Sequence, residues 1–199
     1  MTRGTAPPID SVMWPWGHLA VSYLAYVATV RARGRRQTGA AVAAVAVGSQ
    51  LPDLIDKPLA WTVAVLPSGR SLGHSLLFVA LLAGVGYLLA RRARRTELAV
   101  AFAVGHAAHA LVDLGPDVVL GLLRGDASQL RWTTYLLWPL LPSPPYPSDS
   151  SFAGHVLGYT LDAYAAFEIG LFGVAVAVWL RSGAPGLAVA GRRLRAARG

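Results

Sequence analysis

The stretch RRARRTELAVAFAVGHAAHALVDL, residues 91–114, decides the fold class of this chain. Four arginines precede an apolar run of helical length, and His106, His109 and Asp113 lie near the other end of that run. Arginines that flank an apolar membrane helix tend to stay in the cytoplasm. The stretch therefore predicts a membrane helix that begins in the cytoplasm and carries its ionisable side chains to the opposite side.

The same polarity recurs along the rest of the chain. Of the 18 lysines and arginines, 13 lie in three clusters, at residues 31–36, 91–95 and 181–198, and each cluster follows an apolar run. The apolar runs cover residues 13–30, 38–51, 71–90, 98–114 and 158–180. About five spans with the N-terminus outside and the C-terminus in the cytoplasm place all three clusters on the cytoplasmic side. We therefore predict an all-α, multi-pass membrane helix bundle with short interfacial helices.

Composition supports this class. Hydrophobic residues make up 54% of the chain and charged residues 14%, against about 25% charged in an average soluble domain. We expect one membrane-embedded domain over residues 1–199, with a basic tail from about residue 182. The net charge of +8 would otherwise suggest a nucleic-acid partner, but the arginines flank apolar runs, so we expect a membrane and no nucleic acid. The N-terminus lacks a signal-peptide pattern, and the first helix is expected to be retained.

Two parts of the chain are harder to assign. The second run is rich in small residues, which is typical of close helix packing in lipid, and it is short for a span. It ends at LPDLIDKP, where Pro52 and Pro58 bracket two aspartates that could mark a helix stop and the N-cap of the next turn. Residues 59–66 are predicted to be interfacial or re-entrant, and residues 118–141 either lie on the membrane or dip into it.

All five histidines fall on the non-cytoplasmic side of this topology, together with three aspartates. His109 and Asp113 are four residues apart and so share one helix face. His74 and Asp53 could complete a metal shell from neighbouring helices, with His18 also among the predicted ligands and His106 and His155 as possible additional ones. The chain has no cysteine, so a metal ion would be held by imidazole and carboxylate, which suits zinc and also manganese or iron. Each histidine could instead form a hydrogen bond between helices, and His155 could simply be solvated.

Three other ionisable residues need a role. Arg70 lies four residues before His74 and could clamp a phosphate, or it could be an ordinary surface arginine. Asp56 is a candidate general base, or a residue that orients a metal-bound histidine. Glu168 lies about ten residues into the last run and should be paired, protonated or functional.

Four segments carry a family resemblance: WPWGH with His18, PDLID with Asp53 and Asp56, GRSLGHSLL with Arg70 and His74, and GHAAHALVDL with His109 and Asp113. In this order they resemble the YdjM, or LexA-regulated, inner-membrane metal-dependent hydrolases. Family members more typically carry a further histidine where this chain has Ser68. The order is also similar to zinc-dependent phospholipase C and single-strand nucleases. That similarity implies one ion held by Asp53, His74, His109 and Asp113, with Asp113 bridging to a second ion that His18 helps to bind.

Together these features predict a metal-dependent hydrolase in the plasma or inner membrane. We expect it to cleave a phosphoester, most plausibly on a lipid headgroup, with water activated by the metal at the extracytoplasmic face. Two alternatives use the same residues. A divalent-cation transporter or binding protein would need polar groups across the bundle, and a structural membrane protein would use the histidines only to join helices.

Overall fold

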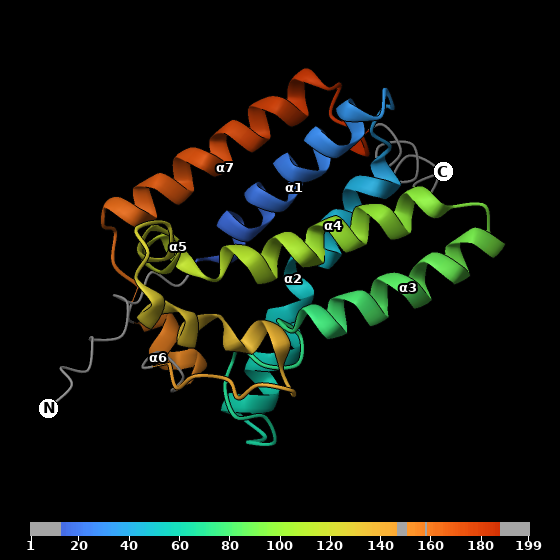
Figure 1. Ribbon diagram of the computed structural model, residues 1–199. Coiled ribbons are helices and arrows are strands. Elements are labelled where there is room, and N and C mark those ends of the chain that lie inside the picture. Colours follow the sequence, from blue (N-terminus) through green and yellow to red (C-terminus); the bar gives the residue numbers. More distant parts are fainter. Residues whose placement is uncertain (1–12, 147–150, 158, 188–199) are drawn as a thin grey trace, which may run out of the picture.

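The computed structural model describes residues 13–146, 151–157 and 159–187, and in these residues every regular element is helical. The elements are α1 (Pro15–Ala32), α2 (Gly39–Trp61), α3 (Leu76–Arg92), α4 (Thr96–Val112), α5 (Gly115–Leu123), the 3₁₀-helix η1 (Ala127–Leu137), α6 (Phe152–Leu157) and α7 (Ala163–Arg181) (Figure 1). The predicted all-α class is confirmed.

Helix α4 is the centre of the bundle. It contacts α1, α2 and α3, while α7 packs along the outer side of α1 (Figure 1). Successive long helices alternate in direction, so the last turns of α1, α3 and α7 and the first turns of α2 and α4 gather at one end of the molecule. We call this the basic end, because it carries Arg31, Arg33, Arg35, Arg36, Arg91, Arg92, Arg94, Arg95 and Arg181. The arginines at 192–198, which complete the third cluster, lie outside the described residues.

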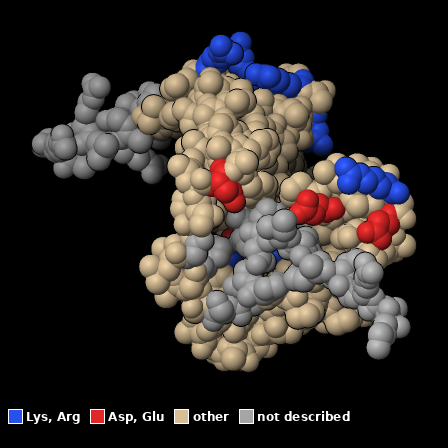
Figure 2. Space-filling view, turned by 90° about the vertical axis from the view of Figure 1, so that its left-hand side faces the viewer, with Lys and Arg blue, Asp and Glu red and all other residues tan. Residues whose placement is uncertain are grey.

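The two ends of the bundle differ in what they bury. Near the basic end, the core consists of apolar and aromatic side chains such as Tyr26, Val30, Val45 and Ala101. Toward the other end many of the buried side chains are polar, among them His18, Ser49, Asp56, Ser71, His74, His106, His109 and Asp113. On the face seen in Figure 2, basic side chains lie along the upper end, and acidic side chains appear lower down, some of them beside a further basic side chain on the right.

Glycines allow α2 and α4 to approach closely. A Cβ atom on Gly48 would lie 2.3 Å from the carbonyl oxygen of Phe102, and one on Gly105 would lie 2.5 Å from that of Val45. Neither position has room for a side chain. The small residues of the second apolar run therefore serve the close packing that the sequence predicts.

The course of α2 differs from the prediction. The helix continues through both Pro52 and Pro58 to Trp61, so Asp53 and Asp56 lie within it rather than at a helix stop or N-cap. Prolines are tolerated in membrane-protein helices where neighbouring groups satisfy the freed backbone. Residues 59–61 form the last turn of α2, and an irregular loop then leads to α3, which begins at Leu76 and not at residue 71.

Among the described residues, the helices differ in whether they are long and apolar enough to cross a membrane. By length and composition, α7 is long and apolar enough to cross a membrane, with a mean hydropathy of 1.8. Helices α4 and α5 meet the same criterion only as a pair, and they bend by 76° where they join. Helices α3 and α4 have 17 residues each, just short of a full span. The number of five spans stays a prediction.

Candidate metal centre

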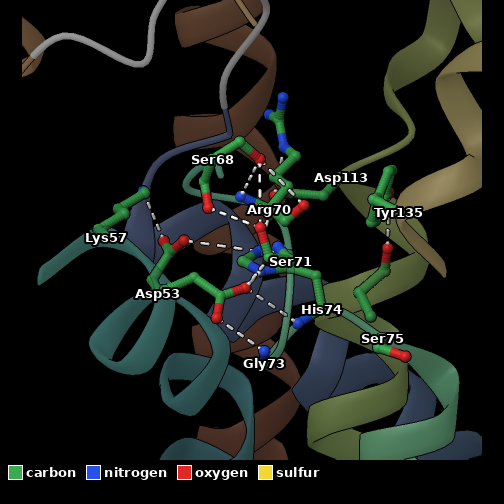
Figure 3. Close-up of polar contacts among 12 residues, drawn as sticks. Asp53, Lys57, Ser68, Arg70, Ser71, Gly73, His74, Ser75, Asp113 and Tyr135 are labelled. Carbon is green, nitrogen blue, oxygen red and sulfur yellow. Dashed lines mark hydrogen bonds and ion pairs between the residues drawn. The ribbon is translucent and has the colours of Figure 1, made fainter. Parts of the chain in front are cut away.

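The loop between α2 and α3 is anchored by one buried carboxylate. Asp56 accepts hydrogen bonds from the backbone N–H groups of Ser71 (2.7 Å), Gly73 (2.7 Å) and His74 (3.3 Å). Its Oδ2 also lies 2.8 Å from Nδ1 of the His74 ring. Asp56 is fully buried, and both of its oxygens are occupied in this way. The carboxylate thus fixes the loop on α2 and turns Nε2 of His74 away from it, toward Asp53 and Asp113 (Figure 3).

His109 is oriented by the backbone of α2. Its Nδ1 contacts the carbonyl oxygen of Ser49, and a carbonyl can only accept, so the proton lies on Nδ1. The Nε2 atom of the ring therefore presents a lone pair toward His74. One face of the His109 ring stacks on the His18 ring, with ring centroids 3.7 Å apart.

Four ligand atoms converge in front of these two rings. Asp53, His74, His109 and Asp113 each offer one atom, and the four atoms lie within 4.8 Å of one another. His74 Nε2 lies 3.1 Å from both His109 Nε2 and Asp113 Oδ2, and 3.6 Å from Asp53 Oδ1. Atoms bound about 2.1 Å from a tetrahedral ion lie about 3.4 Å from one another. The distances from His74 to the other three ligands are therefore close to those expected around a tetrahedral metal ion.

The charges of the group also call for a cation. Lys57 binds Oδ2 of Asp53 at 2.7 Å, and Arg70 Nε binds Oδ2 of Asp113 at 2.8 Å. The second oxygen of each aspartate, Oδ1, is buried and accepts no hydrogen bond from the described residues, although Oδ1 of Asp113 lies 3.2 Å from Nε2 of His18. With Asp56, three carboxylates face two cationic side chains, so the group needs one further positive charge, which either a protonated histidine or a bound metal ion would supply. Such buried oxygens are costly unless a positive ion or a donor satisfies them.

The protonation of His74 fits the same conclusion. Burial by itself would lower the pKa of the imidazole, but its hydrogen bonds to Asp113 and Asp56 and their negative charges outweigh burial and raise the pKa to about 9. At neutral pH the ring therefore carries a second proton, on Nε2, between His109 and Asp113. A cation bound by the four ligands would displace that proton.

Arg70 lies at the rim of the group. Its side chain is 12% exposed, and its guanidinium stacks 4.4 Å above the ring of Tyr146. Two serines hold its backbone: the Arg70 N–H donates to Ser68 Oγ (3.0 Å), and Ser143 Oγ donates to the Arg70 carbonyl (2.7 Å). Among the described residues the guanidinium hydrogen-bonds Asp113 alone, through Nε. Its two terminal nitrogens are thus left for another acceptor.

The remaining candidate residues take other places. His18 lies beside the group, with Nε2 3.2 Å from Asp113 Oδ1, but is not one of the four converging ligands. His106 donates from Nε2 to the carbonyl of Gly73 at 2.7 Å, which ties α4 to the loop and directs the ring away from the ligands. The side chain of His155 lies outside the described residues.

Glu168 has a structural partner far away in the sequence. Its buried Oε1 accepts the backbone N–H of Trp14 at 3.0 Å. Trp14 is the N-cap residue of α1 and provides no side-chain cap of its own. Glu168 on α7 therefore caps the N-terminus of α1 with a side chain from another helix. Of the three roles that the sequence leaves open for Glu168 (paired, protonated or functional), this contact fits the paired one.

Two contacts at the centre were not predictable from the sequence. Tyr135 on η1 is fully buried, donates its hydroxyl to the carbonyl of Ala110 (2.9 Å) and sets its ring edge against His74. In the sequence this tyrosine looks like an ordinary interfacial aromatic. The Ser49 carbonyl that orients His109 is a backbone group, and no residue type signals it.

Comparison with known proteins identifies the family. Residues 13–190 match the family model described as YdjM inner membrane protein, which confirms the resemblance drawn from the four sequence segments. No curated protein and no solved structure matches the chain. The similarity to zinc-dependent phospholipase C stays a prediction. Because the family match covers residues 13–190, which include the four candidate ligands and every helix from α1 to α7, this chain belongs to the YdjM inner membrane protein family.

Proposed function

We propose that this chain is a membrane-bound, metal-dependent hydrolase that cleaves a phosphoester. The observation that carries the proposal is the convergence of Asp53, His74, His109 and Asp113 beside an arginine. Within the described residues, buried carboxylate oxygens of the group accept no hydrogen bond and the terminal nitrogens of the arginine donate none. A ligand set of imidazole and carboxylate without sulfur suits zinc, with manganese or iron as alternatives.

Each residue then has a separate task. The four ligands hold the ion, which would supply a nucleophilic water and polarise the phosphoryl group. Asp56 orients His74 and is unsuited to act as a general base, because its oxygens already accept four hydrogen bonds. Arg70 would bind a phosphate oxygen through its terminal nitrogens and offset the charge that develops there.

The membrane setting favours a lipid substrate. The family is one of inner-membrane proteins, and a site near the end of a helix bundle can receive a lipid headgroup from the side. We place this site at the extracytoplasmic face, in a topology of about five spans with the arginine clusters in the cytoplasm, because the metal group and the basic end lie at opposite ends of the bundle.

A divalent-cation transporter is the principal alternative, since it would use the same ligands. It would also need polar groups that continue toward the basic end. The buried core there contains Ala20, Val27, Val45, Ala101 and Ala175, with Tyr23 and Tyr26. These side chains offer no carboxylate or imidazole to a passing ion, which favours hydrolysis over transport.

The first test is metal content by mass spectrometry on detergent-purified protein. We expect one or two equivalents of a transition metal in the wild type and a loss of at least tenfold in Asp113→Ala, with the helical circular-dichroism signal retained. Asp117→Ala is the matched control, because Asp117 is an exposed aspartate four residues away that binds no ligand of the group. The loaded protein should then hydrolyse a phosphodiester or a phospholipid, and Arg70→Gln should reduce turnover while metal content persists.

Two results would contradict the proposal. A wild-type protein that binds no metal even after metal is added back would show that the four residues do not form a metal centre. A loaded protein that cleaves no phosphoester but carries zinc across vesicle membranes would favour the transporter.

A further inference from the structure

A second concave site lies at the basic end, far from the metal group. A cavity of about 270 Å³ opens between the last turns of α1, the α1–α2 loop, α3 and the start of α4. Arg33, Arg35 and Arg36 of the loop line it, together with Tyr87 of α3 and Thr96 and Glu97 of α4. Small-molecule pockets usually measure about 300–1,000 Å³, so this cavity suits a single headgroup-sized ligand.

The loop that carries the arginines is folded and not a loose linker. The N–H groups of Arg33 and Arg35 donate to the Val30 carbonyl at 3.2 and 3.0 Å, and Gly34 takes a positive φ of 60° to close the turn. These bonds hold three guanidinium-bearing residues on one turn at the rim of the cavity. Preorganised guanidinium groups are well suited to bind phosphate in a bidentate way.

The charge at this site is unbalanced. In the part of the chain that the structure describes, lysine and arginine form ion pairs only through Lys57 and Arg70. Both pairs lie beside the four candidate ligands, at the end of the bundle opposite the basic end, which we call the metal end. The three loop arginines face a single carboxylate in the cavity, that of Glu97, and form no ion pair with it. The start of α4 also lines the cavity and has no side-chain cap, and a helix N-terminus favours an anion.

The neighbouring surface indicates what the anion is attached to. Helix α3 buries only Val79, and large apolar side chains near its C-terminal end, where Tyr87 lines the cavity, are exposed, with Val85 at 47%, Leu88 at 61% and Leu89 at 60%. Free phosphate would need no such surface. Acyl chains of a phospholipid could lie along α3 while the headgroup enters the cavity.

We propose that this cavity binds the phosphate headgroup of an anionic phospholipid at the membrane surface. Basic pockets between membrane helices on the cytoplasmic side are suited to anionic lipid headgroups. The rule that places arginines in the cytoplasm accounts for their charge, but it does not require a folded turn around a cavity. The site is independent of the metal centre and of the hydrolysis proposed for it.

The test compares lipid binding by two triple variants in detergent, using native mass spectrometry with phosphatidylglycerol and phosphatidylcholine. Arg33→Ala/Arg35→Ala/Arg36→Ala removes three charges that line the cavity. Arg91→Ala/Arg92→Ala/Arg94→Ala removes three charges from the same end that do not line it. We expect the first variant to lose phosphatidylglycerol affinity at least tenfold and the second to change less than threefold, with metal content and helicity unchanged in both.

Equal losses in both variants would overturn the proposal in favour of unspecific attraction. A separate arm adds inorganic phosphate to the wild type. Binding of phosphate as tight as that of phosphatidylglycerol would also overturn the lipid assignment and leave a free-anion site. Hydrogen exchange of the wild type gives a readout without any variant: phosphatidylglycerol, but not phosphatidylcholine, should protect residues 31–37 and the first turn of α4, and absence of protection would count against the site.

Discussion

The two ends of this bundle hold their charges in opposite ways. At the metal end, His74, His109 and Asp56 are fully buried, and each is held by a specific partner. At the basic end, Arg33, Arg35 and Arg36 are exposed and form no ion pair within the described residues. Burying ionisable groups in a membrane protein is costly, so such groups mark function more strongly than exposed ones. The metal end is built to fix geometry, whereas the basic end is built to supply charge.

The largest effect on zinc affinity should come from a substitution of Asp56, the carboxylate that orients His74. Asp56→Asn keeps the shape of the side chain but places an amide where a carboxylate accepts N–H groups from the loop and the ring. Loss of a partner that orients a metal-bound histidine typically lowers metal affinity about 10–100-fold. Zinc affinity, measured by competition with a chromophoric chelator, should fall by that amount, while Arg91→Gln at the basic end should leave it unchanged. An affinity within twofold of the wild type would show that Asp56 supports the loop only.

A change of pH should have an intermediate effect on zinc affinity, through His74 at the metal end. Because the pKa of His74 is raised to about 9, its ring carries an extra proton at pH 7, and a bound cation must release that proton. Zinc affinity should therefore rise roughly tenfold per pH unit between pH 6.5 and 8.5 and level off above about pH 9. An indicator dye in weakly buffered solution should report one proton released per ion at pH 7. Affinity that does not vary over this range would refute the assignment of the proton to His74.

The smallest effect should come from Glu168, which is buried near the metal end but serves helix α1. Glu168→Ala removes the acceptor for the Trp14 N–H and should lower the free energy of unfolding by about 1 kcal/mol, as for a lost N-cap. Glu168→Gln keeps an acceptor oxygen and should cost clearly less. Thermal unfolding in detergent measures both, and metal content should stay unchanged. If the glutamine variant is as unstable as the alanine variant, the charge of Glu168 matters more than the cap.

The four ligands could be predicted because their signal is local. His109 and Asp113 are spaced for one helix face, and Asp53 and His74 are ionisable residues at the ends of apolar runs. Topology then brings such residues to one end of a bundle. The same reasoning predicts the apolar core at the other end, since the parts of the runs near the basic end carry mainly apolar and aromatic residues.

What could not be predicted depends on tertiary context. Two prolines indicate a helix end, yet α2 runs through both, and a proline pattern alone does not show where a helix in a packed bundle ends. The sequence pairs His109 with Asp113 and leaves His106 as a possible additional ligand, and the structure directs His106 to the Gly73 carbonyl instead. Backbone carbonyls such as those of Ser49 and Gly73 decide the direction of both rings, and a sequence carries no signal for them.

The anchoring of the α2–α3 loop by Asp56 has a consequence for how this chain can vary. Residues 62–65 are exposed and precede the anchor, so insertions and deletions there should be tolerated. The interval from Ser71 to His74 cannot change length, because its N–H groups and its imidazole bind the same carboxylate. Relatives that share this centre should therefore differ freely in the first part of the loop and keep a fixed count of residues in the second.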